Sequence, residues 1–147
     1  MSQISIIITT SPIISNPSTE IVDHVIDGLK YVGPKEYFSD KDIYIVCDEF
    51  KVNDDDNLID IKKRNYLLYI DQLKEKYSAY NILIRDKKYG CVNNIKYVLD
   101  LIHNDYVILV QHDWASVTDI NIENIINAMN KHDVVKYVGF ESITAVK

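Results

Sequence analysis

The chain has 147 residues, a formal net charge of −6 and two cysteines. This length suits one domain with a buried core, so we interpret residues 1–147 as a single domain. The negative charge argues against a nucleic-acid partner, which usually requires a basic face. The chain has too few cysteines for a disulfide framework, no signal-peptide pattern and no apolar run long enough for a transmembrane segment. We therefore expect a reduced, cytoplasmic protein.

The first part of the chain alternates between strand-like and helix-like patterns. Residues 4–9 are apolar and β-branched, which predicts a buried strand. Asn16 and Pro17 then offer a capping residue followed by a proline suited to the first helical position. The expected buried face of this helix consists of Ile21, Val22, Val25, Ile26 and Leu29. Residues 43–47 predict a second buried strand, which Asp48 follows directly.

The middle of the chain continues this alternation. A polar loop at residues 53–57 precedes a long helical pattern, and a short strand is expected at residues 81–84. The basic segment 85–88 comes next and leads into a third helix. The apolar residues expected to face the core are Ile61, Leu67, Leu68, Ile70, Leu73 and Tyr77 in the first of these helices, and Val92, Ile95, Val98, Leu99 and Ile102 in the second.

The last part of the chain contains an apolar strand that ends abruptly in polar residues. Residues 106–110 predict this strand, and Gln111, His112 and Asp113 follow at once. A helix is expected around residues 122–129, and residues 134–140 predict a final strand. The order βαβαβαβαβ predicts an α/β fold with a single open, mainly parallel sheet and helices on both faces.

Polar clusters follow four of the predicted strands, and they should meet at one edge of the sheet. Right-handed crossovers place the carboxyl ends of parallel strands at the same edge, where open α/β proteins bind ligands. The clusters are Thr9-Thr10-Ser11, Asp48-Glu49, Arg85 to Lys88 and Gln111-His112-Asp113. An acid at that edge can hold a divalent cation and, through it, a phosphate, while a guanidinium binds phosphate bidentately.

Several common α/β sites are absent from the sequence. There is no Gly-x-Gly-x-x-Gly after the first strand, no Gly-x-x-x-x-Gly-Lys-Ser/Thr and no Gly-x-Ser-x-Gly. These absences exclude a P-loop and argue against a dinucleotide-binding Rossmann site and an α/β-hydrolase. A receiver-like or flavodoxin-like signalling domain is a further alternative, but a receiver has an acidic pair after its first strand, where this chain has residues 9–11.

The chain resembles the nucleotide-binding half of a GT-A glycosyltransferase, closest to the family-2 type. Three places carry the resemblance: the first strand running into residues 8–12, the second strand ending in Asp48, and the block from Arg85 to Asp113. That block combines a basic loop, a helix bearing Asn93 and Asn94, and an apolar strand ahead of the position of the family's Asp-x-Asp metal motif.

The resemblance implies a nucleotide-diphosphate sugar donor, Mn²⁺ or Mg²⁺ as cofactor, and transfer to an acceptor hydroxyl on a glycan, protein or lipid that the sequence does not specify. It implies donor-binding roles for Thr10, Ser11, Asp48, Arg85, Asn94 and His112 and a metal-ligand role for Asp113. Within this set, Thr10 and Ser11 would line the nucleoside. Asp48 would bind the base or ribose, and Arg85 would lie near the base and diphosphate.

Two features depart from the family pattern. Gln111 stands where the motif's first acid is expected, which leaves Asp113 as the one certain carboxylate. The family's acceptor-binding half and catalytic base follow the strand predicted at residues 134–140, where this chain offers only Glu141, and no catalytic residue is assigned. We therefore interpret the chain as a nucleotide-sugar-binding domain, either the N-terminal part of a longer glycosyltransferase or a non-catalytic binding or interaction module of the same fold.

Simpler structural roles stay open for the same side chains. Asp113 could cap the turn that follows it, and His112 could be an ordinary loop histidine. Asp48 could be a turn residue, Arg85 could be solvated, and Asn94 could satisfy backbone groups. Each alternative predicts particular hydrogen bonds or solvent exposure for the side chain concerned.

Overall fold

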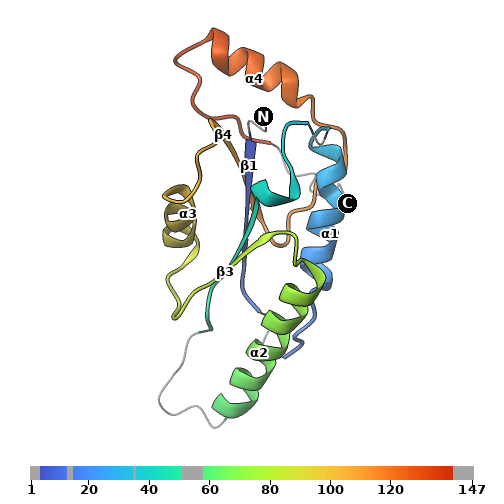
Figure 1. The fold of residues 1–147 in the computed structure, drawn as a ribbon, viewed down its shortest axis with the longest axis vertical. Coiled ribbons are helices and arrows are strands. Elements are labelled where there is room, and N and C mark those ends of the chain that lie inside the picture. Colours follow the sequence, from blue (N-terminus) through green and yellow to red (C-terminus); the bar gives the residue numbers. More distant parts are fainter. Residues whose placement is uncertain (1–3, 13–14, 35, 51–57, 141–147) are drawn as a thin grey trace, which may run out of the picture.

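The computed structural model describes residues 4–12, 15–34, 36–50 and 58–140. Strands and helices alternate along them (Figure 1). The elements are β1 (Ile4–Thr10), α1 (Glu20–Gly28), η1 (Leu29–Tyr31), η2 (Asp40–Asp42), β2 (Ile43–Cys47), α2 (Ile59–Lys76), β3 (Asn81–Ile84), α3 (Cys91–Leu99), β4 (Tyr106–Gln111) and α4 (Ile122–Lys131), with η denoting short 3₁₀ helices. The loop predicted at residues 53–57 and Glu141 lie outside the described residues.

The strands form one parallel sheet in the order β3-β2-β1-β4, which confirms the predicted fold class. The first strand of the chain is therefore central: Ile4 pairs with Tyr106 on β4, and Thr10 pairs with Cys47 on β2. All residues of β1 are buried, as expected for a central strand covered on both faces. The parallel arrangement brings the ends of β1, β2, β3 and β4 together at one side of the sheet, which we call the carboxyl edge.

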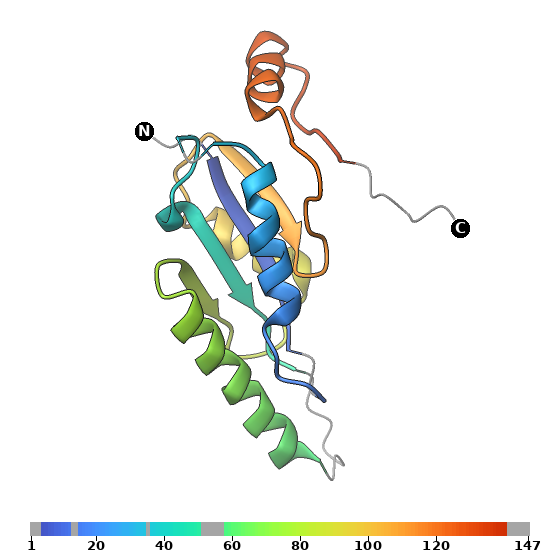
Figure 2. The same ribbon diagram turned by 90° about the vertical axis from the view of Figure 1, so that its right-hand side faces the viewer.

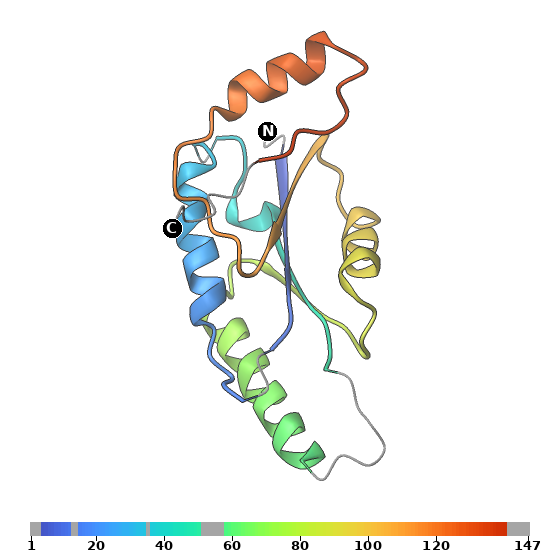
Figure 3. The ribbon, with the colours of Figure 1, turned by 180° about the vertical axis from the view of Figure 1, so that it is seen from behind.

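Helices cover both faces of the sheet, as predicted. Figure 2 shows α1 and α2 on one face, with α3 behind the sheet on the other. Successive β1 side chains point to opposite faces, so Ile6 and Ile8 join the core under α1 and α2, while Ile7 packs with Val46 and Val98 under α3. Helix α4 lies at the opposite end of the molecule from the carboxyl edge (Figure 3). No helix within the described ranges is long and apolar enough to cross a membrane.

The buried face of α2 differs from the prediction. Ile61 and Leu67, expected in the core, are 55% and 60% exposed, and Leu68 is also exposed. Ile70, Leu73 and Tyr77 are buried as predicted, and Tyr66 and Tyr69 are buried beside them. These positions follow helical spacing, but the stripe is largely tyrosine, whose apolar ring can be buried while its hydroxyl finds a polar neighbour. The prediction was therefore right for three of its six residues and missed the two tyrosines.

Other apolar positions predicted to face the core are also exposed. They are Ile21 on α1, and Val92 and Leu99 on α3. In α1 the buried side is formed by Val22, Val25 and Gly28, and in α3 by Asn94 and Val98. A short helix buries only a narrow stripe against a sheet, so apolar residues next to that stripe remain accessible.

Helix α1 begins later than predicted. Its first residue is Glu20 rather than Pro17, and Thr19 is the N-cap. The Glu20 amide donates to Ser18 Oγ at 3.1 Å, and the Asp23 amide donates to the Thr19 carbonyl at 2.9 Å. Local hydrogen bonds at residues 18 and 19 therefore replace the predicted start at Asn16 and Pro17.

The strand predicted at residues 134–140 is wrong. These residues form no strand, and Val134 and Tyr137 are 90% and 82% exposed. An apolar, β-branched sequence becomes a strand only where a neighbouring strand completes its hydrogen bonds. The segment has no such neighbour among the described residues, where the sheet ends at β4.

Candidate functional site

The carboxyl edge brings together the polar clusters that follow the four strands. The backbone amides of Asp48, Arg85 and His112 each donate to a carbonyl of the neighbouring strand, at 2.9, 3.0 and 3.1 Å. These bonds extend the sheet pairing by one residue beyond β2, β3 and β4. The three residues consequently leave the sheet at the same edge, as the sequence predicted from the parallel topology: Asp48 and Arg85 follow neighbouring strands, and His112 follows β4 on the other side of β1.

The Asp48 carboxylate holds the loop between β3 and α3. Its Oδ1 accepts a hydrogen bond from the Tyr89 amide and its Oδ2 from the Gly90 amide, both at 2.8 Å. The side chain is buried, with 6% of the residue exposed. Gly90 has a φ of +83° and is the N-cap of α3, so this carboxylate fixes the entry into that helix. Asp48 therefore anchors the loop before α3, whereas one alternative gave it only the role of a turn residue.

Arg85 lies against two aromatic side chains. Its guanidinium carbon is 4.2 Å from the ring centroid of Tyr89 and 3.9 Å from that of Tyr97. Lys87 also lies over the Tyr89 ring, at 5.0 Å. The Arg85 side chain forms no hydrogen bond or ion pair with another described residue, and its Nε is buried without a partner. This is not the environment of an ordinary solvated loop arginine.

Two further buried polar atoms near this edge lack partners. Asn94 is only 1% exposed, and its Oδ1 has no hydrogen-bond partner among the described residues. The Tyr66 hydroxyl is likewise buried without a hydrogen-bond partner. The Tyr66 ring packs edge-on against Phe50, just after β2. Burial above all, and then the charges of Cys47, Glu49 and Asp48, raises the pKa of Tyr66, so its hydroxyl stays protonated.

The unpaired groups of Tyr66, Arg85 and Asn94 are unlike the rest of the described interior. They are the only buried side-chain nitrogen or oxygen atoms without a partner in the part of the chain that the structure describes. Each such atom costs about 1–3 kcal/mol of stability, so natural proteins keep few of them. Their association with the strand ends of one edge is typical of a binding site rather than of a packed core.

Thr10 and Ser11, predicted to line a nucleoside, have different environments. Ser11 is exposed, whereas Thr10 is buried and its Oγ1 lies 2.5 Å from the Tyr69 hydroxyl on α2. Burial is the main cause that raises the pKa of Tyr69, so that hydroxyl is neutral and either group can be the donor. The Thr10 side chain therefore binds α2 and is directed away from solvent.

The hydrogen bond between Thr10 and Tyr69 should stabilise the protein measurably. Thr10→Val and Tyr69→Phe should each lower the free energy of unfolding by about 1–2 kcal/mol, because each leaves a buried hydroxyl unpaired. The double variant should lose less than the sum of the two single losses. Urea unfolding of the four proteins measures the coupling, and strictly additive losses would show that the two hydroxyls do not interact.

Asp113 is exposed and has no hydrogen-bond partner among the described residues. The turn after β4 is closed by backbone, because the Trp114 amide donates to the Gln111 carbonyl at 3.1 Å. The alternative in which the Asp113 carboxylate caps this turn is therefore not what the structure shows. His112 Nδ1 lies 3.3 Å from the Thr9 carbonyl, which leaves Nε2 as the ring nitrogen for a ligand.

The residues at this edge fit a cation only when a substrate completes its coordination. No group of three His, Cys, Asp or Glu side chains within the described ranges could hold a metal ion. Mg²⁺ commonly uses one or two carboxylates with substrate phosphates and water. Asp113 meets that minimum, and Gln111 cannot add a second carboxylate.

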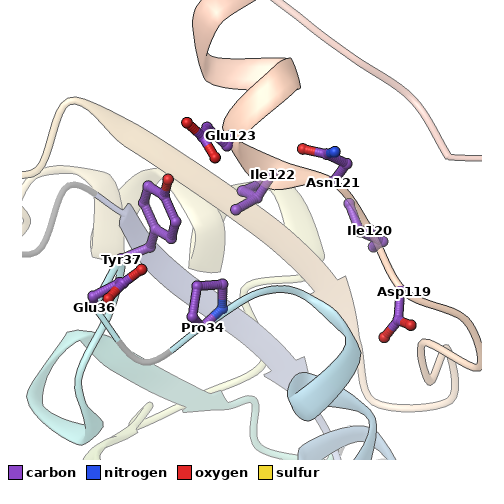
Figure 4. A pocket seen from close by; sticks show the side chains of 8 residues that line it. All are labelled: Pro34, Glu36, Tyr37, Asp119, Ile120, Asn121, Ile122 and Glu123. Atoms are coloured by element: carbon purple, nitrogen blue, oxygen red, sulfur yellow. The ribbon is translucent and has the colours of Figure 1, made fainter.

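A cavity of about 350 Å³ lies elsewhere on the molecule. Figure 4 shows its lining side chains, among them Tyr37, Glu123 and Asp119. The Tyr37 carbonyl accepts the amide of Ile4 at the start of β1, so the cavity lies at the amino ends of the strands. This cavity is therefore separate from the site that the strand ends form.

The aromatic residues of the carboxyl edge were not among the site residues predicted from the sequence; they are Tyr66, Tyr69, Tyr89 and Tyr97. Tyr66 and Tyr69 follow the helical spacing of the buried α2 residues, which was a usable signal. Tyr97 follows Asn94 by one helical turn and so lies on the same side of α3. No sequence pattern indicated that Tyr89 and Tyr97 would both reach Arg85.

No protein-family model matches the sequence, and no curated protein matches it. Among solved structures, the crystal structure of S. aureus TarS, a glycosyltransferase, is similar with a TM-score of 0.55 and 14% sequence identity. The match covers 96% of this chain and 23% of the TarS chain. The chain therefore spans about a quarter of the length of that structure. The likeness, at this identity, concerns the fold alone: the chain shares an α/β fold with TarS, in agreement with the fold class predicted from the sequence.

Proposed function

We propose that the chain is a GT-A domain of the family-2 type that binds a nucleotide-diphosphate sugar with Mn²⁺ or Mg²⁺ for transfer to an acceptor hydroxyl. The observation that carries this proposal is the presence, at the carboxyl edge, of both an unneutralised guanidinium after β3 and an exposed carboxylate after β4. Arg85 has no described acidic partner, and Asp113 has no described hydrogen-bond partner. A diphosphate with its cation would complement both groups. The glycosyltransferase-like fold supports the same proposal.

The proposed chemistry requires charge neutralisation at the leaving group. Negative charge develops on the nucleoside diphosphate as the bond to the sugar breaks, and Arg85 would stabilise that charge with two edge N–H groups. Asp113 would hold the cation, with His112 Nε2 beside it, and the bound cation would supply further stabilisation of the same charge. Ser11 is accessible for the nucleoside. The base that would deprotonate the acceptor hydroxyl is not assigned to a described residue.

The metal role of Asp113 can be tested by calorimetric titration of UDP and GDP with and without Mn²⁺. Wild type should bind at least one nucleotide in a Mn²⁺-dependent way, and Asp113→Ala should weaken that binding about tenfold or more, because it removes the only carboxylate assigned to the cation. Asp119→Ala is the matched control: Asp119 is exposed and lines the cavity at the other end of the molecule, so its loss should not change the affinity.

The outcomes of this titration separate the parts of the proposal. Nucleotide binding that is independent of metal, or unchanged in Asp113→Ala, would contradict the metal role. Absence of binding of both nucleotides would contradict the proposed function itself. Release of sugar from the corresponding nucleotide sugar would distinguish transfer from binding alone.

A further inference from the structure

We propose that Asp48 is a positioning residue that sets the affinity for the diphosphate of the donor rather than a residue that reads its base or ribose. By holding the β3–α3 loop, Asp48 places Tyr89 against Arg85, and Tyr89 with Tyr97 fixes the guanidinium for edge-on capture of phosphate oxygens. This inference rests on the proposed function, because it concerns how that same site binds its nucleotide.

The first step is the engagement of the Asp48 carboxylate. Both of its oxygens accept backbone N–H groups, from Tyr89 and Gly90 at 2.8 Å, and the residue is 6% exposed. An ionised carboxylate offers only acceptor sites. A base or ribose donor would therefore have to reach a buried group whose oxygens already accept hydrogen bonds. The structure instead uses the negative charge to anchor two consecutive amides.

The second step is the rigidity of the anchored residue. The Tyr89 amide donates to Asp48, and the Tyr89 carbonyl accepts from Asn93 Nδ2 at 2.9 Å. The next residue, Gly90, has a φ of +83°, which an L side chain rarely adopts. The backbone of Tyr89 is thus held on both sides, and its ring is the one that lies 4.2 Å from the Arg85 guanidinium.

The third step is the way in which Arg85 can meet a ligand. The rings of Tyr89 and Tyr97 lie 4.2 and 3.9 Å from its guanidinium carbon, so two aromatic rings of the protein already occupy stacking positions that a nucleobase would use. Its Nε is buried, and it has no ion-pair partner among the described residues. The terminal N–H groups are what remains for a ligand, and their planar geometry suits phosphate oxygens.

The two possible roles of Asp48 predict that its substitution weakens the binding of different parts of the nucleotide. A positioning role affects ligands that carry phosphates, whereas direct contact with the base or ribose affects the nucleoside as well. Asp48→Asn tests this difference, because the amide keeps one acceptor oxygen but places an NH₂ donor against the other backbone N–H. Tyr97→Leu removes one of the two rings from a partly exposed position, and Tyr97→Phe keeps the ring.

In the experiment, wild type and these variants are titrated in the presence of Mn²⁺ with three ligands. These are pyrophosphate, whichever of UDP and GDP wild type binds, and the matching nucleoside, whose binding is measured by ligand-observed NMR. We expect Asp48→Asn and Tyr97→Leu to weaken the nucleotide and pyrophosphate by about fivefold or more, through loss of the placed charge-assisted contact. The nucleoside should bind each variant as it binds wild type, and Tyr97→Phe should behave like wild type.

A second measurement tests the positioning role without any ligand. Amide hydrogen exchange at Tyr89 and Gly90 should become faster in Asp48→Asn, while exchange in β1 stays slow. Unchanged exchange at both amides would overturn the inference, as would loss of nucleoside binding with pyrophosphate binding intact. If wild type binds neither nucleotide nor pyrophosphate, the proposed function fails, and faster exchange would then support only the anchoring of the loop by Asp48.

Discussion

Leu73→Ala should lower the free energy of unfolding by about 3–4 kcal/mol, whereas Leu67→Ala, the same substitution on the same helix, should change it by less than about 0.5 kcal/mol. Leu73 is fully buried in the core between α2 and the sheet, so its truncation leaves a cavity that the surroundings fill only in part. Leu67 is 60% exposed and loses few contacts.

Urea unfolding followed by circular dichroism measures both variants under the same conditions. The comparison controls for helix propensity, because both substitutions replace leucine by alanine inside α2. A loss for Leu67→Ala equal to that for Leu73→Ala would show that Leu67 is buried as predicted from the sequence. It would contradict the exposure of Leu67 in the structure.

The two cysteines should differ in reactivity by more than about a thousandfold, because labelling of a fully buried thiol requires an opening that costs several kcal/mol. Cys91 is exposed at the first position of α3, while Cys47 is fully buried in β2. Burial, and to a lesser extent Asp48, raises the pKa of the Cys47 thiol to about 12. Since the thiolate is the nucleophile, Cys47 is protected both by its burial and by the protonation of its thiol.

Titration with a chromogenic disulfide reagent should therefore find one reactive thiol per folded chain and two after unfolding in guanidinium chloride. Cys91→Ser should leave no fast-reacting thiol in the folded protein. Two fast thiols in folded wild type would contradict the burial of β2. Cys91 Sγ lies 3.7 Å from Thr9 Oγ1 at the carboxyl edge, so a bound nucleotide should slow its labelling if the proposed function holds.

The fold was predictable because the strongest sequence signals describe its central elements. The apolar runs at β1 and β2 are buried strands inside the sheet, the run at β4 is an outer strand, and their alternation with helices requires parallel connections. That topology alone places residues 48, 85 and 112 at one edge. The general location of the candidate site therefore followed from chain order, before any side-chain contact was considered.

The contacts within the site were not predictable in the same way. Thr10 meets Tyr69 across 59 positions in the sequence, and Asp48 meets Tyr89 across 41. No local pattern encodes such pairs, because hydrophobic periodicity reports which face of an element is buried and not which residue lies opposite. The strand predicted at residues 134–140 failed for a related reason: strand formation depends on a partner, and the local sequence contains only the propensity.

The position of β1 has a consequence for how the protein reaches its native state. Among the described strands, β1 is synthesised before the strands on either side of it, and it pairs through Ile4 with Tyr106, far along the chain. One side of β1 therefore stays unpaired until β4 has been synthesised. During that time the isoleucine side chains of β1 are accessible to other chains. Such high contact order slows folding and prolongs exposure to aggregation. Truncation before β4 should accordingly give insoluble protein, even though β1, α1, β2, α2 and β3 would all be present.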